Sequence, residues 1–167
     1  EEFPDGFLPP APDDGEALLL AAVAAYARRR YIDRAVRTTG QLEGYGRRVE
    51  AEWVVQVQGH RLRLSLEPVA GGCDVTHAGA AHALRTDWKL GEVLLRGTWD
   101  GRPVCVQVER VGWKFRVSHR GVQADATVLP ERDAELLALM PVKPPPDLSK
   151  FLISPMPGLL TQVAVAP

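Results

Sequence analysis

The residues that could do chemistry in this chain are four histidines and two cysteines: His60, His77, His82, His119, Cys73 and Cys105. His77 and His82 are separated by four residues, in a segment with strand and turn character. That spacing does not place two ligands on one face, and no cysteine or acid completes a tetrahedral set beside them. The histidines are therefore expected to be surface or turn residues, and no catalytic or metal-binding residue is predicted.

Phosphate binding and thiol chemistry are not predicted either. Gly71-Gly72 and the pair Gly44 and Gly46 are not followed by Lys-Ser or Lys-Thr, and neither pair lies between a strand and a helix. Cys105 is expected to be an inert thiol packed on a strand among valines. The two cysteines form no CxxC motif, which favours a reduced, cytoplasmic setting without disulfides.

The composition limits the partners that the chain can have. It has 167 residues and a net charge of -1, with 25% charged residues, enough for one domain with a real core. This balance favours neither a nucleic acid nor an anionic membrane as a partner. No signal peptide or transmembrane run is recognisable. The local exception is an arginine cluster between Arg28 and Arg37.

The element expected to position everything else is a long helix over residues 13–38. From Ala17 to Ala27 the phenol of Tyr26 is the one polar group. A helix that is apolar on every side must be surrounded by protein or lipid. The run is shorter than the roughly 20 residues that a bilayer requires. The rest of the chain is therefore expected to enclose this helix.

The ends of the helix are marked by capping residues. Asp13 or Asp14 can cap the first turn, and Glu16 lies three residues after Asp13, as in a capping box. Arginines fill the later turns, where cations suit the helix dipole, and Gly40 is a natural stop. The helix is thus expected to have a packed first half and a charged second half.

Strands with one apolar face are expected from Val49 to Leu129, where apolar and polar residues alternate with period two. Trp113, Phe115 and Val117 illustrate the pattern, as do Val93 and Leu95 on another strand. Turn residues divide the region into hairpins at four places: Gln58-Gly59-His60, Gly79, Asp100-Gly101 and Arg120-Gly121. The spacing predicts an antiparallel meander of about eight strands.

These elements predict an α+β fold, in which the sheet closes into a barrel around the long helix. Closure hides the sheet edges, and the inner faces can pack against the alanine-rich helix. A barrel filled in this way is expected to have no ligand cavity. A short helix over residues 131–140 and a proline-rich linker follow the barrel.

The segment after the long helix is expected to be a loop that carries binding residues. Residues 37–48 contain three glycines and show no apolar period. Leu42 and Tyr45 lie near its tip, and apolar side chains on a loop held by a rigid scaffold are often contact residues. The alternative is that both side chains fold back onto the domain.

Two segments, one near each end of the chain, have distinctive sequences: Ser154-Pro155-Met156-Pro157-Gly158 with the alternating Val163 and Val165, and residues 2–7 (EFPDGF). The first is similar to the opening of a biotin carboxyl carrier domain, and the second resembles the end of a biotin carboxylase domain. Both domains occur in the biotin-dependent acyl-CoA carboxylases, among which the chain most resembles the α subunit of propionyl-CoA carboxylase. Between these two domains, that α subunit has a long helix wrapped by an eight-stranded antiparallel barrel.

The resemblance implies a domain order. Residues 1–12 would be the lead-in from the biotin carboxylase domain, and residues 13–140 the helix-in-barrel docking domain. Residues 141–150 would be a linker, and residues 151–167 the start of the carrier domain. The biotin-carrying lysine would lie beyond Pro167, so no cofactor is expected in this chain, whereas the parent enzyme would use ATP, bicarbonate, biotin and a divalent metal.

The resemblance also implies a non-catalytic role, in which the domain joins the α subunit to the carboxyltransferase β subunit. The loop over residues 38–46 would be the hook that enters the β subunit. This places the interface on five residues: Thr39, Gly40, Gln41, Leu42 and Tyr45.

Two alternatives stay open. Methylcrotonyl-CoA carboxylase has a related α subunit, and the choice of acyl group belongs to the β subunit. Apart from the family, the chain could be a stand-alone barrel that binds a small apolar ligand. The position of the long helix separates these two classes, because a helix outside the barrel would leave a lined pocket inside it.

Overall fold

The computed structural model describes residues 11–46 and 49–141, together with residues 147–148, 151, 158–159 and 161–162. The EFPDGF segment lies outside these residues, as do most of the SPMPG segment and most of the linker. The assignments of the lead-in, the linker and the carrier-domain start therefore stay predictions.

The long helix, α1 (Asp14–Val36), begins where the sequence predicts. Asp13 is the N-cap, and its carboxylate accepts a hydrogen bond of 2.8 Å from the backbone N–H of Glu16. The side chain of Glu16 does not complete a capping box. Its Oε1 instead lies 2.6 Å from Nδ1 of His119 on a distant strand, so the first turn of α1 is tied to the barrel wall.

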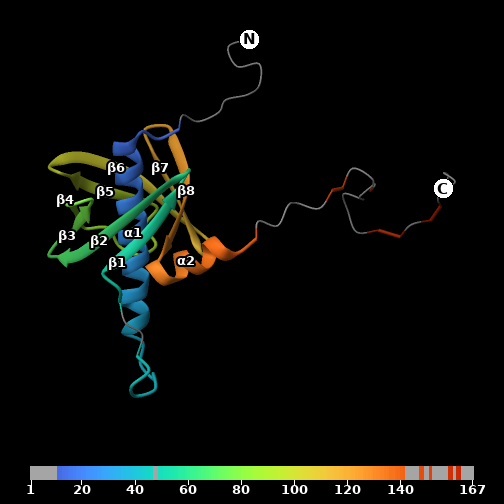
Figure 1. Cartoon of the computed structure of the whole chain (residues 1–167), viewed down its shortest axis with the longest axis horizontal. Coiled ribbons are helices and arrows are strands. Elements are labelled where there is room, and N and C mark those ends of the chain that lie inside the picture. The colour runs from blue at the N-terminus through green and yellow to red at the C-terminus, as the bar shows by residue number, and fades with distance from the viewer. Residues whose placement is uncertain are drawn as a thin grey trace, which may run out of the picture.

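Eight antiparallel strands form a closed barrel in which each strand pairs with the next and β8 pairs with β1. Their bounds are β1 (Glu52–Val57), β2 (His60–Val69), β3 (Gly72–His77), β4 (Ala80–Thr86), β5 (Leu94–Trp99), β6 (Arg102–Val111), β7 (Lys114–His119) and β8 (Val122–Leu129). Figure 1 shows α1 running through the middle of this barrel and continuing beyond it. The predicted fold is confirmed.

The interior of the barrel is filled by the apolar half of α1. The alanines from Ala21 to Ala27 have no exposed surface, and Leu20 and Val23 are equally buried. Inward-facing strand residues such as Val55, Leu64 and Val117 complete the same core. The helix therefore occupies the space that an apolar ligand would need, which removes the geometric basis of the ligand-binding alternative. Within the described residues, no helix has the length and apolar character to cross a membrane.

The two ends of the barrel are built differently. Four tight turns gather at the end where α1 begins: Gln58-Gly59, Ala78-Gly79, Asp100-Gly101 and Arg120-Gly121. Both residues of each turn have positive φ, as in the type I′ turns that suit right-twisted hairpins. We call this end the turn mouth. The other end, where α1 leaves the barrel, carries the β2–β3, β4–β5 and β6–β7 connections, and we call it the exit mouth.

A second helix, α2 (Glu131–Leu139), follows β8 directly. It packs against β1 and β8 and buries Ala134. An ion pair of 2.7 Å between Glu131 and Arg63 of β2 holds its first turn. The predicted short helix is thereby confirmed.

Two apolar residues expected on strands lie outside them. Trp113 is in the β6–β7 turn and is 50% exposed, and Val93 precedes β5 and is 52% exposed. Gly112 has a positive φ of 63° and Gly91 one of 99°, so each glycine turns the chain just before the alternating pattern begins. The alternating sequence pattern therefore continues past the end of the strand, toward the exit mouth, at both places.

Candidate functional site

The loop over residues 38–46, which we call the hook loop, is held away from the barrel by the outer turns of α1. In Figure 1 these turns extend past the exit mouth and the loop forms the far tip. Gln41 fixes the joint, because its Nε2 donates to the carbonyl oxygens of Ala35, Val36 and Thr38 at 3.3, 2.7 and 2.9 Å. The bond to Val36 satisfies a carbonyl that a helix end otherwise leaves without a partner.

The predicted interface residues do not all have the same part in this loop. Leu42 is 76% exposed and Tyr45 is 84% exposed, so neither side chain folds back onto the barrel. The backbone N–H of Tyr45 donates to the carbonyl of Leu42 at 3.1 Å, which makes a tight turn between them. Gly40, with a φ of 85°, supplies the reversal after the helix. Gln41 is engaged in capping, and Thr39 is exposed beside it.

Further apolar side chains surround the exit mouth. Four lie on the β4–β5 and β6–β7 connections or the adjoining strand ends, with exposed fractions from 40% to 52%: Val93, Leu94, Val111 and Trp113. None of the large apolar side chains that the structure describes is exposed at the turn mouth. Exposed apolar surface of this kind, when gathered on one side, marks interaction sites.

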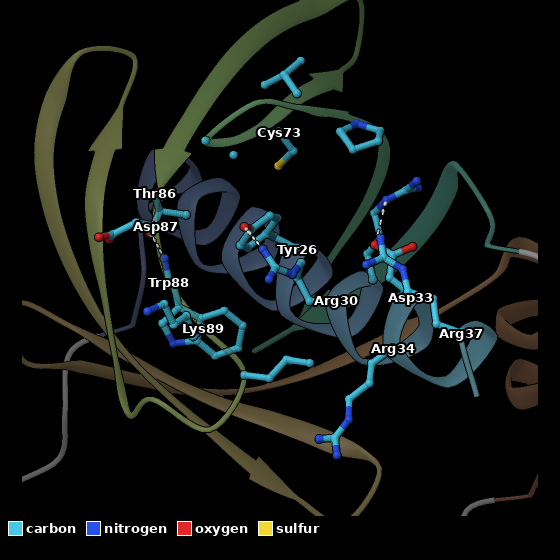
Figure 2. A pocket seen from close by; sticks show the side chains of 16 residues that line it. Tyr26, Arg30, Asp33, Arg34, Arg37, Cys73, Thr86, Asp87, Trp88 and Lys89 are labelled. Carbon is cyan, nitrogen blue, oxygen red and sulfur yellow. Dashed lines mark hydrogen bonds and ion pairs between the residues drawn. The ribbon is translucent and has the colours of Figure 1, made fainter. Parts of the chain in front are cut away.

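A groove with a volume of about 650 Å³ opens at the exit mouth between α1 and two barrel connections. We call it the basic groove, and Figure 2 shows the outer turns of α1 facing residues 86–89 across it. It is lined by Tyr26, Arg29, Arg30, Asp33, Arg34, Arg37, residues 68–69, residues 71–73 and residues 86–90. The groove lies at the mouth of the barrel beside α1, outside the helix-filled interior to which the prediction of no ligand cavity applies.

Two arginines of the groove serve the fold. Arg30 Nη1 donates to the hydroxyl of Tyr26 at 2.9 Å. Arg29 Nη1 donates to the carbonyl of Glu50 at 2.9 Å, and its Nε lies 3.9 Å from the Asp33 carboxylate. The bond from Arg29 to Glu50 connects the charged half of α1 to the chain just before β1, whereas the contacts with Tyr26 and Asp33 lie within the helix.

The expectation that Cys105 is a packed thiol is wrong. Cys105 is exposed on the outer face of β6, whereas Cys73 is the buried thiol, at the inner wall of the basic groove. Burial raises the pKa of Cys73 to about 12, because a thiolate loses its hydration in an apolar setting. Cys73 is therefore protonated and unreactive at neutral pH.

The histidines lie apart rather than forming a site. His119 is buried and pairs with Glu16, so its expected surface position is wrong. The sequence around His119 resembles a turn and does not indicate this pairing. His82 stacks on Trp99 with ring centroids 5.1 Å apart and lies 2.8 Å from Asp100. Within the described residues, no three histidines, cysteines or acids are placed to hold a metal.

The carboxylate of Asp100, in the β5–β6 turn, makes two hydrogen bonds to β4. Burial raises its pKa, but hydrogen bonds from His82 and from the backbone N–H of Ala83 outweigh that effect and leave the pKa below its ordinary value. The carboxylate thus clips the β5–β6 turn to β4 at the turn mouth.

The chain is similar to one protein-family model and to one longer protein. A family model described as the propionyl-coenzyme A carboxylase BT domain matches residues 20–143. The chain is 36% identical over 166 residues to the propionyl-CoA carboxylase alpha chain of Ruegeria pomeroyi. That match covers 99% of this chain and 24% of the relative, so the chain spans about a quarter of the relative's length.

Proposed function

Because the chain belongs to the propionyl-coenzyme A carboxylase BT-domain family, we propose that it docks an α subunit onto a carboxyltransferase β subunit through the hook loop. The observation that carries this proposal is the exposure of Leu42 (76%) and Tyr45 (84%) on a loop braced by a helix inside a barrel. Apolar anchors presented on a rigid support lose little conformational entropy when they bind.

The remaining surface of the exit mouth also supports binding of the β subunit at this end of the barrel. Val93, Leu94, Val111 and Trp113 are exposed at the end from which the hook loop projects. A partner that covers the hook loop can also cover these side chains, and burial of apolar surface contributes about 25 cal/mol per Å². We therefore place the β subunit over the exit mouth, with Leu42 and Tyr45 as its central contacts.

The same family relation leads us to propose the reaction of the parent enzyme. It carboxylates propionyl-CoA with ATP, bicarbonate and biotin in the cytoplasm, with a divalent metal accompanying ATP. Both chemical steps then take place outside residues 13–140, in flanking domains and in the β subunit. The contribution of this domain to catalysis is the distance and orientation that it fixes between those active sites.

The test compares one substitution at two sites of similar exposure. Leu42→Asp in the full natural chain is expected to leave the fold intact and to weaken binding of the purified β subunit at least about tenfold, because a new charge must be desolvated on docking. Leu139→Asp on α2 is the matched control, since Leu139 is 79% exposed and lies outside the hook loop.

Binding by titration calorimetry distinguishes the outcomes, with circular dichroism to verify folding. Equal affinity of Leu42→Asp and the unchanged chain would exclude the hook loop as the main contact. An equal loss of affinity in Leu42→Asp and Leu139→Asp would contradict the placement of the main interface on the hook loop.

A further inference from the structure

The basic groove carries more positive charge than its own acids neutralise. Two carboxylates line it, Asp33 and Asp87. Against them stand five cations: Arg29, Arg30, Arg34, Arg37 and Lys89. The chain as a whole has a net charge of -1, so this excess is a local feature of the exit mouth.

Three of these cations are not used by the fold. Within the part of the chain that the structure describes, the side chains of Arg34, Arg37 and Lys89 make no ion pair or hydrogen bond, in contrast to Arg29 and Arg30. Arg34 and Arg37 are exposed, so they do not contribute to the packed core. Like charges held close together without counter-charges repel one another, and an anionic partner would relieve that repulsion.

The spacing of the arginines indicates the shape of the anion. Arg30 and Arg34 lie one turn apart on α1, about 6 Å along the axis, and Arg37, the C-cap residue, lies about 4.5 Å farther on. This elongated row can face charges that are distributed along a polypeptide, whereas a single compact anion requires donors that converge on one point.

The walls and the position of the groove also favour a polypeptide. Val69 and Leu90 are half-buried apolar residues beside the charges, and Gly71 leaves space for a backbone. Figure 2 shows Arg34 and Arg37 on the outermost turns of the helix. The hook loop begins at the residue after Arg37, so a protein that covers the loop passes directly over the groove.

We propose that the basic groove receives an acidic segment of the carboxyltransferase β subunit, held by Arg34, Arg37 and Lys89 while the hook loop supplies the apolar contacts. This inference rests on the proposed docking function and adds the charge of the partner segment. Complementary charge at the rim of an interface speeds association and rejects partners of the wrong sign, and it contributes less to the lifetime of the complex.

The experiment measures association of the purified β subunit with the full natural chain, by stopped flow or surface plasmon resonance at several salt concentrations. Arg34→Glu/Arg37→Glu is expected to reduce the association rate at least about tenfold at about 50 mM salt, with a small change in dissociation rate. The loss is expected to shrink to about twofold or less near 1 M salt, where the Debye length is about 3 Å. Arg34→Lys/Arg37→Lys keeps the charge and is expected to retain most of the rate.

The control is Arg61→Glu, which makes half the charge change of the double variant at an exposed strand arginine beside the Gln58-Gly59 turn at the turn mouth. It changes net charge in the same direction at the opposite end of the barrel, so it is expected to leave association nearly unchanged. Equal slowing by Arg61→Glu would show a general charge effect and would overturn the groove assignment.

The outcomes separate this inference from the docking proposal. If Leu42→Asp loses binding and Arg34→Glu/Arg37→Glu associates normally, the groove assignment is wrong and docking stands. If neither set of variants changes binding, both proposals fail. A titration with inorganic phosphate tests whether the groove binds a small anion instead. Saturable phosphate binding that disappears in Arg34→Glu/Arg37→Glu would overturn the acidic-segment proposal in favour of a small-anion site.

Discussion

Two glycines allow neighbouring strands to approach where a side chain would not fit. A Cβ on Gly72 would lie 2.0 Å from the carbonyl oxygen of Leu84, and a Cβ on Gly97 would lie 2.1 Å from that of Arg85. Both contacts are with backbone atoms of β4, which cannot rotate away. These positions fix how β4 fits between β3 and β5, and so determine the curvature of the barrel at that side.

Gly97→Ala is therefore expected to destabilise the domain by about 2 kcal/mol or more, because β4 and β5 must separate to admit the methyl group. Urea unfolding followed by circular dichroism measures the change. Gly46→Ala is the control, since its nearest contact would be 3.8 Å away, to the flexible end of Gln41. An equal effect of the two changes would contradict the close approach of the strands.

A pH effect is expected at Asp100. Since its folded-state pKa lies below the ordinary value, the carboxylate contributes stability above the unfolded pKa of about 4, and this contribution is lost as pH falls through the folded pKa. Asp100→Asn keeps a residue that tolerates the positive φ of 50°. The variant should be less stable than the unchanged chain at pH about 7, and the gap should close below pH about 4.

Unfolding free energies at a series of pH values check this expectation. Glu43→Gln, an exposed hook-loop change, is expected to show a much smaller effect across the same series. A gap between Asp100→Asn and the unchanged chain that stays constant with pH would mean that the carboxylate clip is not the cause.

At the scale of elements, α1 has an enclosed half that packs in the barrel and an outer half that is exposed. Its alanine-rich half is completely enclosed, whereas Arg34 and Ala35 are exposed beyond the exit mouth. The enclosed half leaves little room for larger residues because the barrel surrounds it, with β1, β2, β6, β7 and β8 closest to the helix. The outer half has no such limit, and its position is fixed by Arg29 and Gln41 contacts at the backbone.

The same substitution in the two halves tests this difference. Ala24→Leu is expected to cost about 1–3 kcal/mol through overpacking of the barrel. Ala35→Leu, on the same helix but exposed, should change stability by less than about 0.5 kcal/mol. Thermal and urea unfolding of both variants measure the contrast, and equal stabilities would show that α1 is not confined as described.

Sequence periodicity predicted these elements because each is specified locally. An unbroken apolar run bounded by capping residues identified α1, and turn residues with glycine identified the hairpins of the turn mouth. The basic groove was not predicted, because it joins α1 to residues 68–73 and 86–90. The arginine cluster was visible in the sequence, but the connections facing it were not. The burial of His119 was missed for the same reason, since Glu16 lies 103 residues away in the chain.

At the scale of the whole molecule, the two mouths differ in what they present. The turn mouth has tight turns, the hydrogen-bonded Asp100 carboxylate and the Glu16–His119 pair. The exit mouth has the hook loop, exposed apolar side chains and the basic groove. One end thus stabilises the barrel and the other is available for binding, and the family relation gives that end its proposed partner.

Hydrogen–deuterium exchange of the full natural chain, with and without the β subunit, tests this polarity most directly. Backbone amides of residues 38–46, 87–94 and 110–113 should exchange more slowly in the complex, while those of residues 58–60, 99–102 and 119–122 should be unchanged. Protection confined to the turn mouth, or an unprotected hook loop in a saturated complex, would contradict the account.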